Sequence, residues 1–359
     1  MAAEAGDQGA HDDREPAQKV ITVLEPADEY PHEPDEAQNY NESMYLNAFD
    51  LGSEAGGWFR LGNRVNEGYA EMSVCIYLPD GRVGFMFDRP KITSNDEMNA
   101  GGLRIDVHEP FEHLSVHYDV KVCLLETPGD MADPRRAFAE NPLVPASVDI
   151  DWLGVSPMYG GKPQYADGRE LEQEAGSSFA KAHYEQHCRT TGTITVGDEA
   201  LDIAGFGLRD KSWGPRYWQA IAWYRWLPIV FGDDFAMMVS LVARDRERPP
   251  SAGGMVLSDG AYHLITDCTI DADWDEKGEQ TGLRCWAKTD EREYEVSGEV
   301  ISMIPLRNRR KSPDGEQLQT RITEAMTRYE CDGRRGMGMS EFLDQVVDGH
   351  PVGVPREQD

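Results

Sequence analysis

One short stretch of this sequence concentrates the residues that could do chemistry. In Gly205–Gln219, "GFGLRDKSWGPRYWQ", an arginine, an aspartate and a lysine follow one another as Arg209, Asp210 and Lys211. An aspartate that is removed from water has a raised pKa, which suits it to act as a general acid or base. A nearby arginine can hold a carboxylate or enolate oxygen of a small molecule. The stretch therefore predicts a catalytic group of Arg209, Asp210 and Lys211.

The same stretch predicts a pocket wall, because aromatic side chains gather around the charges. Four of the eight tryptophans lie between Trp213 and Trp226. Ligand pockets combine apolar, aromatic walls with a few polar anchors. In a regular strand Arg209 and Lys211 would face one way and Asp210 the other. The alternative is a purely structural Arg–Asp pair capped by tryptophans at the rim of a barrel.

Two further clusters add expected substrate-binding residues. "GGWFRLGNRVNEGYAEM" gathers polar groups around glycines, and "GRRGMGMSEFLDQ" places a glutamate in a predicted last strand, from which it could pair with an arginine. A salt-bridged turn and a solvated strand residue are the structural alternatives. The predicted substrate-binding residues are Trp213, Arg216, Trp218, Tyr224, Trp58, Arg64 and Glu341.

Metal and cofactor motifs are not found. His113 and His117 share a predicted strand face with His108 nearby, but no cysteine or carboxylate follows at metal-ligand spacing. His183 and His187 are four residues apart without the HExxH pattern. "DADWDEKGEQTG" lacks the glycine and final glutamate of a calcium loop. No glycine-rich nucleotide motif or GxSxG elbow is present. We therefore expect no metal and no cofactor.

The elements that must position these residues are predominantly strands. In "AEMSVCIYLPDGRVGFMFD" apolar residues alternate up to the turn at Pro79–Gly81, and "HLSVHYDVKVCLLE" alternates throughout. Only "DPRRAFAENP" predicts a clear short helix, so parallel βαβ units are not expected. Gly205 and Gly207 inside a strand indicate a bulge or a close backbone approach. The pattern predicts an all-β protein of two antiparallel β-barrel or sandwich domains with short helices.

The predicted domains occupy residues 39–184 and 185–345. Residues 1–38 are acidic and rich in proline, which predicts a disordered tail. Residues 346–359 are expected to form a flexible tail.

Charge and cysteine usage exclude several classes of protein. With 65 acidic against 35 basic residues, the formal net charge of −30 disfavours nucleic acid and anionic lipid as partners. No apolar run is long enough for membrane insertion. The six scattered cysteines predict buried free thiols in a reducing compartment, and the first residues do not form a signal peptide. These features predict a cytoplasmic protein, and the sequence makes no prediction of its oligomeric state.

The segment "LRDKSWGPRYW" resembles the arginine–aspartate–x–serine–tryptophan–glycine signature of the lipocalin-like carotenoid 1,2-hydratase (hydroxyneurosporene synthase) superfamily. "NESMYLNAFD" and "YEQHCRTTGTITV" are similar to its uncharacterised actinobacterial and proteobacterial branch, over about residues 40 to 345. The resemblance implies two lipocalin-like barrels with a ligand cavity in or between them, and it points to Arg209, Asp210, Ser212, Trp213 and Gly214. Lys211 stands where relatives commonly carry a histidine.

Together the residues and the resemblance predict a cofactor-independent lyase or isomerase of hydratase, dehydratase or cyclase type. Its substrate would be a hydrophobic terpenoid-, steroid- or polyketide-like molecule. The alternative is a non-catalytic carrier for such a small molecule, which Lys211 in place of histidine favours.

Overall fold

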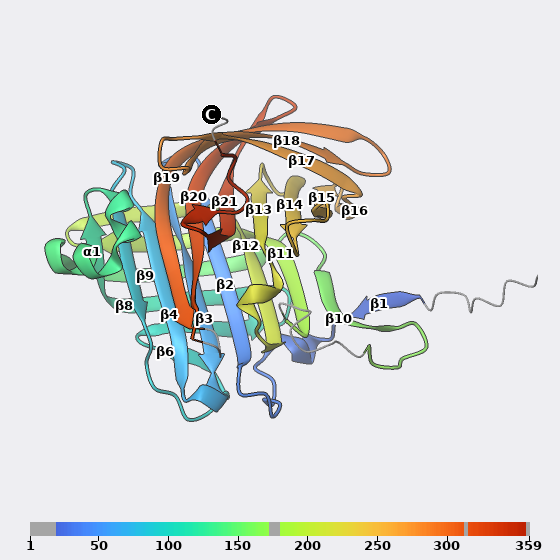
Figure 1. Cartoon of the computed structure of the whole chain (residues 1–359), viewed down its shortest axis with the longest axis horizontal. Coiled ribbons are helices and arrows are strands. Elements are labelled where there is room, and N and C mark those ends of the chain that lie inside the picture. Colours follow the sequence, from blue (N-terminus) through green and yellow to red (C-terminus); the bar gives the residue numbers. More distant parts are fainter. Residues whose placement is uncertain (1–18, 172–179, 312–314, 357–359) are drawn as a thin grey trace, which may run out of the picture.

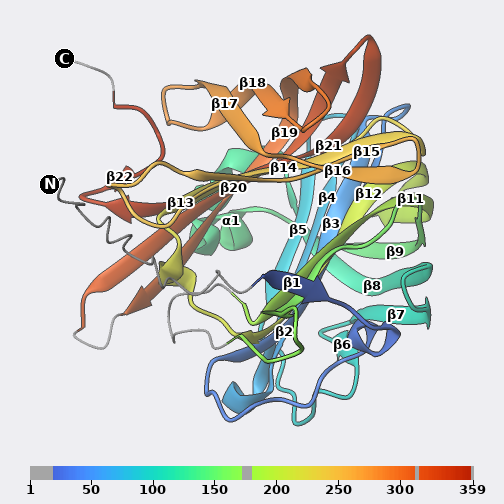
Figure 2. The ribbon, with the colours of Figure 1, turned by 90° about the vertical axis from the view of Figure 1, so that its right-hand side faces the viewer.

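The fold consists of two large antiparallel β-sheets, which confirms the predicted all-β class with two lipocalin-like domains and short helices. The computed structural model describes residues 19–171, 180–311 and 315–356. Within these ranges one sheet has twelve strands and the other ten. The second sheet, yellow to red in Figure 1, lies across the barrel strands of the first (Figure 1; Figure 2).

Eight strands of the first sheet close into an antiparallel barrel. Each pairs with the next in the order β2, β3, β4, β5, β8, β9, β11 and β12, and β12 pairs back with β2. Their bounds are β2 (Tyr40–Asp50), β3 (Ala55–Arg64), β4 (Tyr69–Tyr77), β5 (Val83–Asp88), β8 (His113–Leu125), β9 (Leu143–Gly154), β11 (Ala182–Val196) and β12 (Glu199–Pro215). The remaining four are β1 (Val20–Val23), β6 (Met98–Ala100), β7 (Leu103–Glu109) and β10 (Tyr159–Tyr165).

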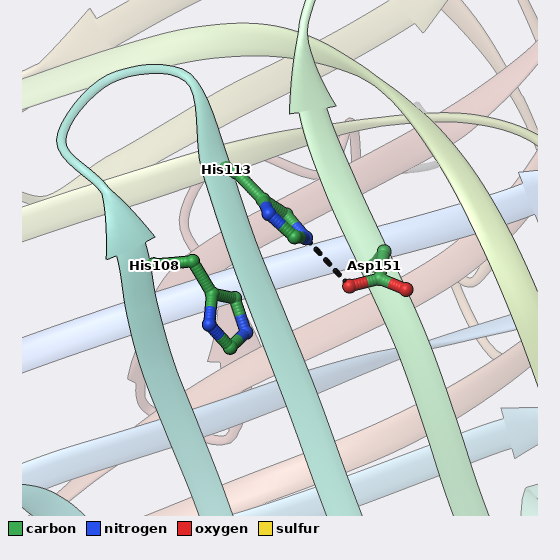
Figure 3. Close-up of side chains that lie close together, drawn as sticks. All are labelled: His108, His113 and Asp151. Atoms are coloured by element: carbon green, nitrogen blue, oxygen red, sulfur yellow. Dashed lines mark hydrogen bonds and ion pairs between the residues drawn. The ribbon is translucent and has the colours of Figure 1, made fainter.

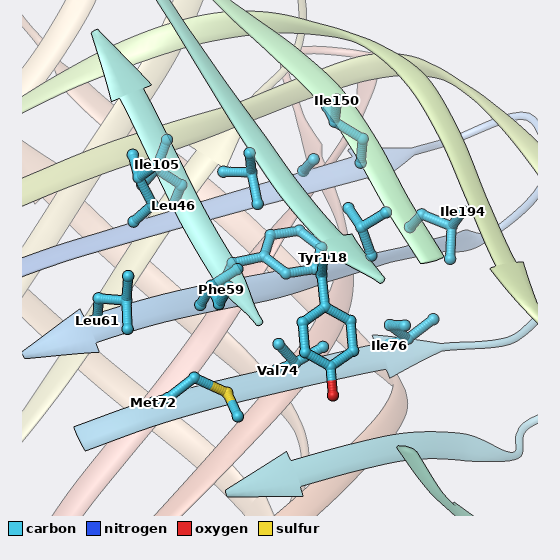
Figure 4. Close-up of a cluster of buried hydrophobic side chains, with 14 of the residues drawn as sticks. Leu46, Phe59, Leu61, Met72, Val74, Ile76, Ile105, Tyr118, Ile150 and Ile194 are labelled. Atoms are coloured by element: carbon cyan, nitrogen blue, oxygen red, sulfur yellow. The ribbon is translucent and has the colours of Figure 1, made fainter. Parts of the chain in front are cut away.

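The interior of this barrel is a packed core. Strand alternation sends one face of each strand inward, and a large cluster of these inward side chains is buried and hydrophobic, as Figure 4 shows. An eight-stranded barrel is just wide enough for such side chains to fill it. Inward-facing members include Leu46, Phe59, Val74, Ile150 and Ile194. Any ligand site must therefore lie outside the barrel interior.

The second sheet curls around a core of its own. Strand β17 returns toward β14, where the Cys268 thiol lies 3.6 Å from the carbonyl oxygen of Ser240. Leu227, Met237 and Phe342 belong to its buried apolar cluster. Its strands are β13 (Trp223–Val230), β14 (Phe235–Ala243), β15 (Ser251–Ser258), β16 (Ala261–Leu264), β17 (Asp267–Trp274), β18 (Gln280–Lys288), β19 (Glu293–Lys311), β20 (Gln317–Cys331), β21 (Arg334–Val347) and β22 (His350–Pro351).

Short helices occupy the connections. The predicted helix in "DPRRAFAENP" is α1, which has proline at its first position and the Asp133 side chain as N-cap acceptor for the Arg136 amide. The helices are η1 (Pro26–Glu29), η2 (Val65–Glu67), η3 (Pro128–Ala132), α1 (Pro134–Glu140) and η4 (Trp218–Ala220).

A close backbone approach explains one glycine of the opening stretch. A Cβ on Gly207 would lie 1.7 Å from the carbonyl oxygen of Asn47 on β2. The Asn47 side chain also accepts the Leu208 amide at 2.9 Å, in place of a regular ladder bond. Only glycine allows β12 to close the barrel at this point.

The chain changes sheet later than the predicted domain limit. Residue 184 lies inside β11, and the β11–β12 hairpin is part of the barrel because it pairs with β9 and β2. The second sheet begins only at Trp223, after the crossing from Pro215. The domain limits 39–184 and 185–345 themselves stay a prediction.

Both predicted tails contain ordered residues. The described part of the N-terminal segment forms β1, which pairs with β10, and η1, whose Glu29 is fully buried. At the other end β21 continues to Val347 and pairs with β22, and the Gly353 carbonyl accepts a hydrogen bond from Arg225. Disorder is therefore a wrong expectation for residues 20–29, which dock against the barrel. Residues 1–18 and 357–359 lie outside the described residues.

The six cysteines are free and buried, as predicted. No helix among the described residues is both long enough and apolar enough to cross a membrane.

Candidate active site

A cavity of about 700 Å³ lies between the two sheets. One wall is the outer face of the barrel, where Tyr45 points away from the interior that Met44 and Leu46 fill. The other wall comes from β13, β14, β20 and β21, with Trp226 and Glu341 among its residues. Each sheet thus packs a core of its own on one face and contributes its other face to the cavity.

Six of the predicted site residues line this cavity. Each lies in one of three places: the outer face of the barrel, the segment that crosses between the sheets, or the strands of the second sheet that face the barrel. The six are Asp210, Trp58, Arg216, Trp218, Tyr224 and Glu341. The stretch Gly205–Gln219 therefore does contribute to the cavity wall, at the end of β12 and in the segment that crosses to the second sheet.

Arg209 and Lys211 lie elsewhere, because their side chains leave β12 on the face opposite to Asp210. Arg209 Nη1 is 2.5 Å from Glu29 Oε2, and Lys211 Nζ is 2.9 Å from Glu42 Oε1. Both basic side chains are buried, and burial lowers the pKa of Lys211. The structure thus corrects their predicted position: both are held in ion pairs away from the cavity. It also separates Arg209 from Asp210, so these two residues do not form the Arg–Asp pair of the structural alternative.

Trp213 and Arg64 are also outside the cavity lining. The Trp213 ring stacks on His32 with 4.1 Å between centroids, beneath the docked N-terminal segment. Arg64 is buried and donates to Glu67, which is the salt-bridged turn that was the structural alternative. Neither side chain lies where it could contact a ligand in the cavity.

Asp210 is joined by two residues that the sequence analysis did not place beside it. In the β11–β12 ladder Glu185 stands directly opposite Asp210, and His183 follows two residues away on the same face. His183 Nε2 hydrogen-bonds to Asp210 Oδ2 and lies 3.7 Å from Glu185 Oε1. Although burial alone would lower the pKa of His183, the Asp210 carboxylate raises it to about 9. The His183 imidazole is therefore protonated at neutral pH.

Glu185 has the environment of a proton donor. It is 1% exposed, and burial raises its pKa to about 7. Trp226 Nε1 donates to Glu185 Oε1 at 2.8 Å. Its Oε2 is buried without a hydrogen-bond partner among the residues that the structure describes. A carboxyl group that is oriented on one oxygen and open on the other can exchange a proton near neutral pH.

A second acidic group lies on the facing wall. Glu341 and Glu324 are directly opposite on β21 and β20, Tyr224 donates its hydroxyl to Glu341, and Tyr45 lies 3.4 Å from Glu324. Burial raises the pKa of Glu341 to about 7, and burial with the Glu341 charge raises that of Glu324. Two carboxyls this close share protons rather than ionise together.

Because burial raises the pKa of Glu341 in the folded chain, the folded chain binds a proton that the unfolded chain has already lost between about pH 4.5 and 7. This stabilisation is complete at low pH and disappears as the pH rises through 7. From pH 5 to pH 8 the free energy of unfolding of Glu341→Gln should therefore rise by about 2–3 kcal/mol relative to that of the wild type, as measured by urea unfolding. Glu295→Gln, which removes an exposed carboxyl, is the control. A Glu341→Gln difference independent of pH would contradict the buried acidic pair.

His183, Glu185 and Asp210 each offer a ligand atom, and these atoms lie within 4.8 Å of one another, so this group could also hold a metal ion. His187 does not join it, because its Nδ1 lies 3.0 Å from the Tyr262 hydroxyl. The spacing of His183 and His187 therefore creates no shared site.

The sequence model of a family described as a domain of unknown function (DUF7064) matches residues 25–346. No curated protein matches in sequence. Among solved structures, an AttH-like protein from Nitrosomonas europaea is similar with a TM-score of 0.54 and 13% identity, covering 86% of this chain and 93% of that chain. Kievitone hydratase from Nectria haematococca has a TM-score of 0.51 and 9% identity, covering 89% and 92%. These likenesses show a shared fold, and the carotenoid hydratase branch stays a prediction.

Proposed function

This chain belongs to the DUF7064 family, and we propose that it is a lyase or isomerase that transfers a proton to a hydrophobic small molecule held between the two sheets. The proposed substrate is terpenoid-, steroid- or polyketide-like. The proposed reaction is a hydration, dehydration or cyclisation that requires no redox step.

The observation that carries the proposal is the Glu185 carboxyl group. It lines the cavity, its pKa is about 7, and its buried Oε2 has no partner among the described residues. Catalytic acids need a pKa near the working pH and a free path to the substrate. A purely structural buried glutamate would have both oxygens satisfied.

Aromatic rings around the cavity would stabilise the positive charge that protonation of an alkene creates. Tyr45 and Trp58 stack with 5.7 Å between centroids, and Trp226 meets Tyr45 edge-on at 5.6 Å. The faces of such rings attract cations. The adjacent carboxylate of Asp210, held by His183, adds a fixed negative charge.

In the hydration form of the reaction, Glu185 gives its proton to one alkene carbon and a water oxygen bonds to the other. The second proton of that water then returns to the Glu185 carboxylate, so the acid is regenerated. Dehydration is the reverse. Asp210 positions His183 beside this group, and Arg209 and Lys211 take no part because they lie outside the cavity. The name of kievitone hydratase, a protein of similar fold, agrees with this class of reaction.

One end of the cavity is rich in arginine, which indicates a polar end on the substrate. Arg60 and Arg89 share a single carboxylate, Glu71, at 3.4 and 3.5 Å. Arg60 Nη2 is buried without a hydrogen-bond partner in the described part of the chain. Burial, with the nearby Arg60 charge, lowers the pKa of Arg216 to about 9. A substrate carboxylate or enolate oxygen would supply the missing negative charge.

Replacing Arg60 with glutamine should weaken binding of a carboxylic acid ligand about tenfold and leave binding of its methyl ester nearly unchanged, because only the acid loses a charged hydrogen bond. The measurement is quenching of tryptophan fluorescence, since Trp58, Trp218 and Trp226 line the cavity. Arg104→Gln, outside the cavity, is the control. Equal losses for acid and ester would contradict an oxygen-binding role for Arg60.

The function itself is tested by incubating the protein with a panel of terpenoids, steroids, polyketides and fatty acids. Ligands that change the tryptophan fluorescence are then extracted and analysed by mass spectrometry. A mass change of one water, or an isomer with a new retention time, is the expected result. Bound ligand that is always recovered chemically unchanged would overturn the enzyme and favour the carrier.

A further inference from the structure

A second cluster of metal-binding side chains lies on the outer face of the barrel, away from the cavity. Figure 3 shows His108, His113 and Asp151, which come from the neighbouring strands β7, β8 and β9. One possible ligand atom of each lies within 4.8 Å of the other two. His113 Nε2 is 2.6 Å from Asp151 Oδ1, and the two imidazole rings have centroids 4.4 Å apart.

The barrel core fixes the relative positions of these three strands. Leu114, Ile150 and Trp152 alternate with the cluster residues and are at most 1% exposed on the inner face. A slip of one residue would turn these apolar side chains into water, so the register is strongly determined. The ladder of β7 shifts its register between Val107 and Glu109, which places a bulge at His108. Bulges re-aim side chains and often accompany functional sites.

Neighbouring polar groups orient the cluster. The Ser115 hydroxyl lies 2.7 Å from His108 Nε2 and 3.1 Å from His117 Nε2. His117 Nδ1 in turn lies 3.1 Å from Asp149 Oδ1. Such hydrogen bonds fix the ring orientation of histidine ligands in metal sites.

We propose that His108, His113 and Asp151 bind a divalent transition-metal ion of the Zn²⁺ class, with water in the remaining position. Imidazole nitrogens and one carboxylate suit Zn²⁺, and its bonds are about 2.0–2.2 Å long. The metal would replace the His113–Asp151 hydrogen bond, and any proton on the rings would be released to solvent. Asp151 comes 38 positions after His113 in the sequence, so the sequence analysis found no short metal-ligand spacing between them. This site does not depend on the function proposed for the cavity.

The test is a calorimetric titration of the full chain with ZnCl₂ near pH 7.5. One ion is expected per chain, and His108→Ala, His113→Ala and Asp151→Asn should each weaken binding by about tenfold or more. His183→Ala removes a ligand from the acidic group of the cavity, and His263→Ala removes a histidine outside both groups. Both control variants should keep wild-type Zn²⁺ binding. Circular dichroism of each variant confirms its fold, and the lost side chains lie on the outer face of the sheet.

Three results would overturn the proposal. The first is a wild-type chain that binds no Zn²⁺. The second is binding that survives in the His108→Ala/His113→Ala double variant. The third is binding that is lost only in His183→Ala, which would place the ion in the cavity.

Discussion

Replacing Glu29 with alanine is expected to lower the free energy of unfolding by about 3–5 kcal/mol, because it leaves the Arg209 guanidinium buried without its carboxylate. Glu29 is fully buried and Arg209 is 3% exposed. The Tyr184 hydroxyl and the Phe111 amide also donate to Glu29, each at 2.9 Å. Alanine therefore leaves three donors, those of Arg209, Tyr184 and Phe111, with fewer acceptors than they have in the native chain.

The measurement is urea unfolding followed by tryptophan fluorescence, with Glu33→Ala as the matched control. Glu33 is an exposed carboxyl in the same segment, so its loss should change the unfolding free energy by less than about 0.5 kcal/mol. Equal stability of the two variants would mean that the segment does not dock on the barrel as described.

The same ion pair helps to order a segment for which the sequence predicted disorder. Its composition is acidic and rich in proline, and such segments cannot bury enough apolar surface to become ordered by themselves. The segment is ordered instead by contacts with Arg209 and Lys211, which are distant from it in sequence and lie on the same face of β12. Two cations that are buried in the barrel require acceptors, and residues 28–30 supply a carboxylate and two carbonyl oxygens.

Strand identity was accessible from the sequence, whereas the part of the cavity wall that β2 forms was not. Alternation revealed the strand around Val116, since its outward neighbours Ser115 and His117 are polar. In β2, however, every residue from Tyr40 to Phe49 is buried, because one face fills the barrel and the other faces the second sheet. With both faces covered, no polar pattern shows which side chains would line a cavity.

The acidic partner of Asp210 could have been predicted. The turn at Gly197–Asp198 pairs Val196 with Glu199, and a regular antiparallel ladder counted back from this pair places Glu185 opposite Asp210. The contacts of Glu185 with Trp226 could not be counted in this way, because they join different sheets.

Glu185→Gln is expected to lower turnover of the substrate identified by the panel by about 10²–10⁴-fold, the usual contribution of a general acid or base. Glutamine keeps the size of the side chain and an oxygen that accepts from Trp226 Nε1, so the fold and ligand affinity should stay near wild type. Only the proton is lost. Asp210→Asn should cost less, because Asp210 acts through His183.

The pH profile separates this role from a structural one. Because the proton of Glu185 is the reactant, wild-type turnover should be constant below about pH 7 and fall tenfold per unit above it. The small remaining turnover of Glu185→Gln should lack this descending limb, and fluorescence titration should still detect ligand binding. Wild-type turnover in Glu185→Gln would remove Glu185 from the mechanism. A variant that has lost both binding and stability would instead assign it a structural role. The limb depends on a carboxyl group that lines the cavity, whose pKa burial raises to about 7 and whose second oxygen has no hydrogen-bond partner among the described residues.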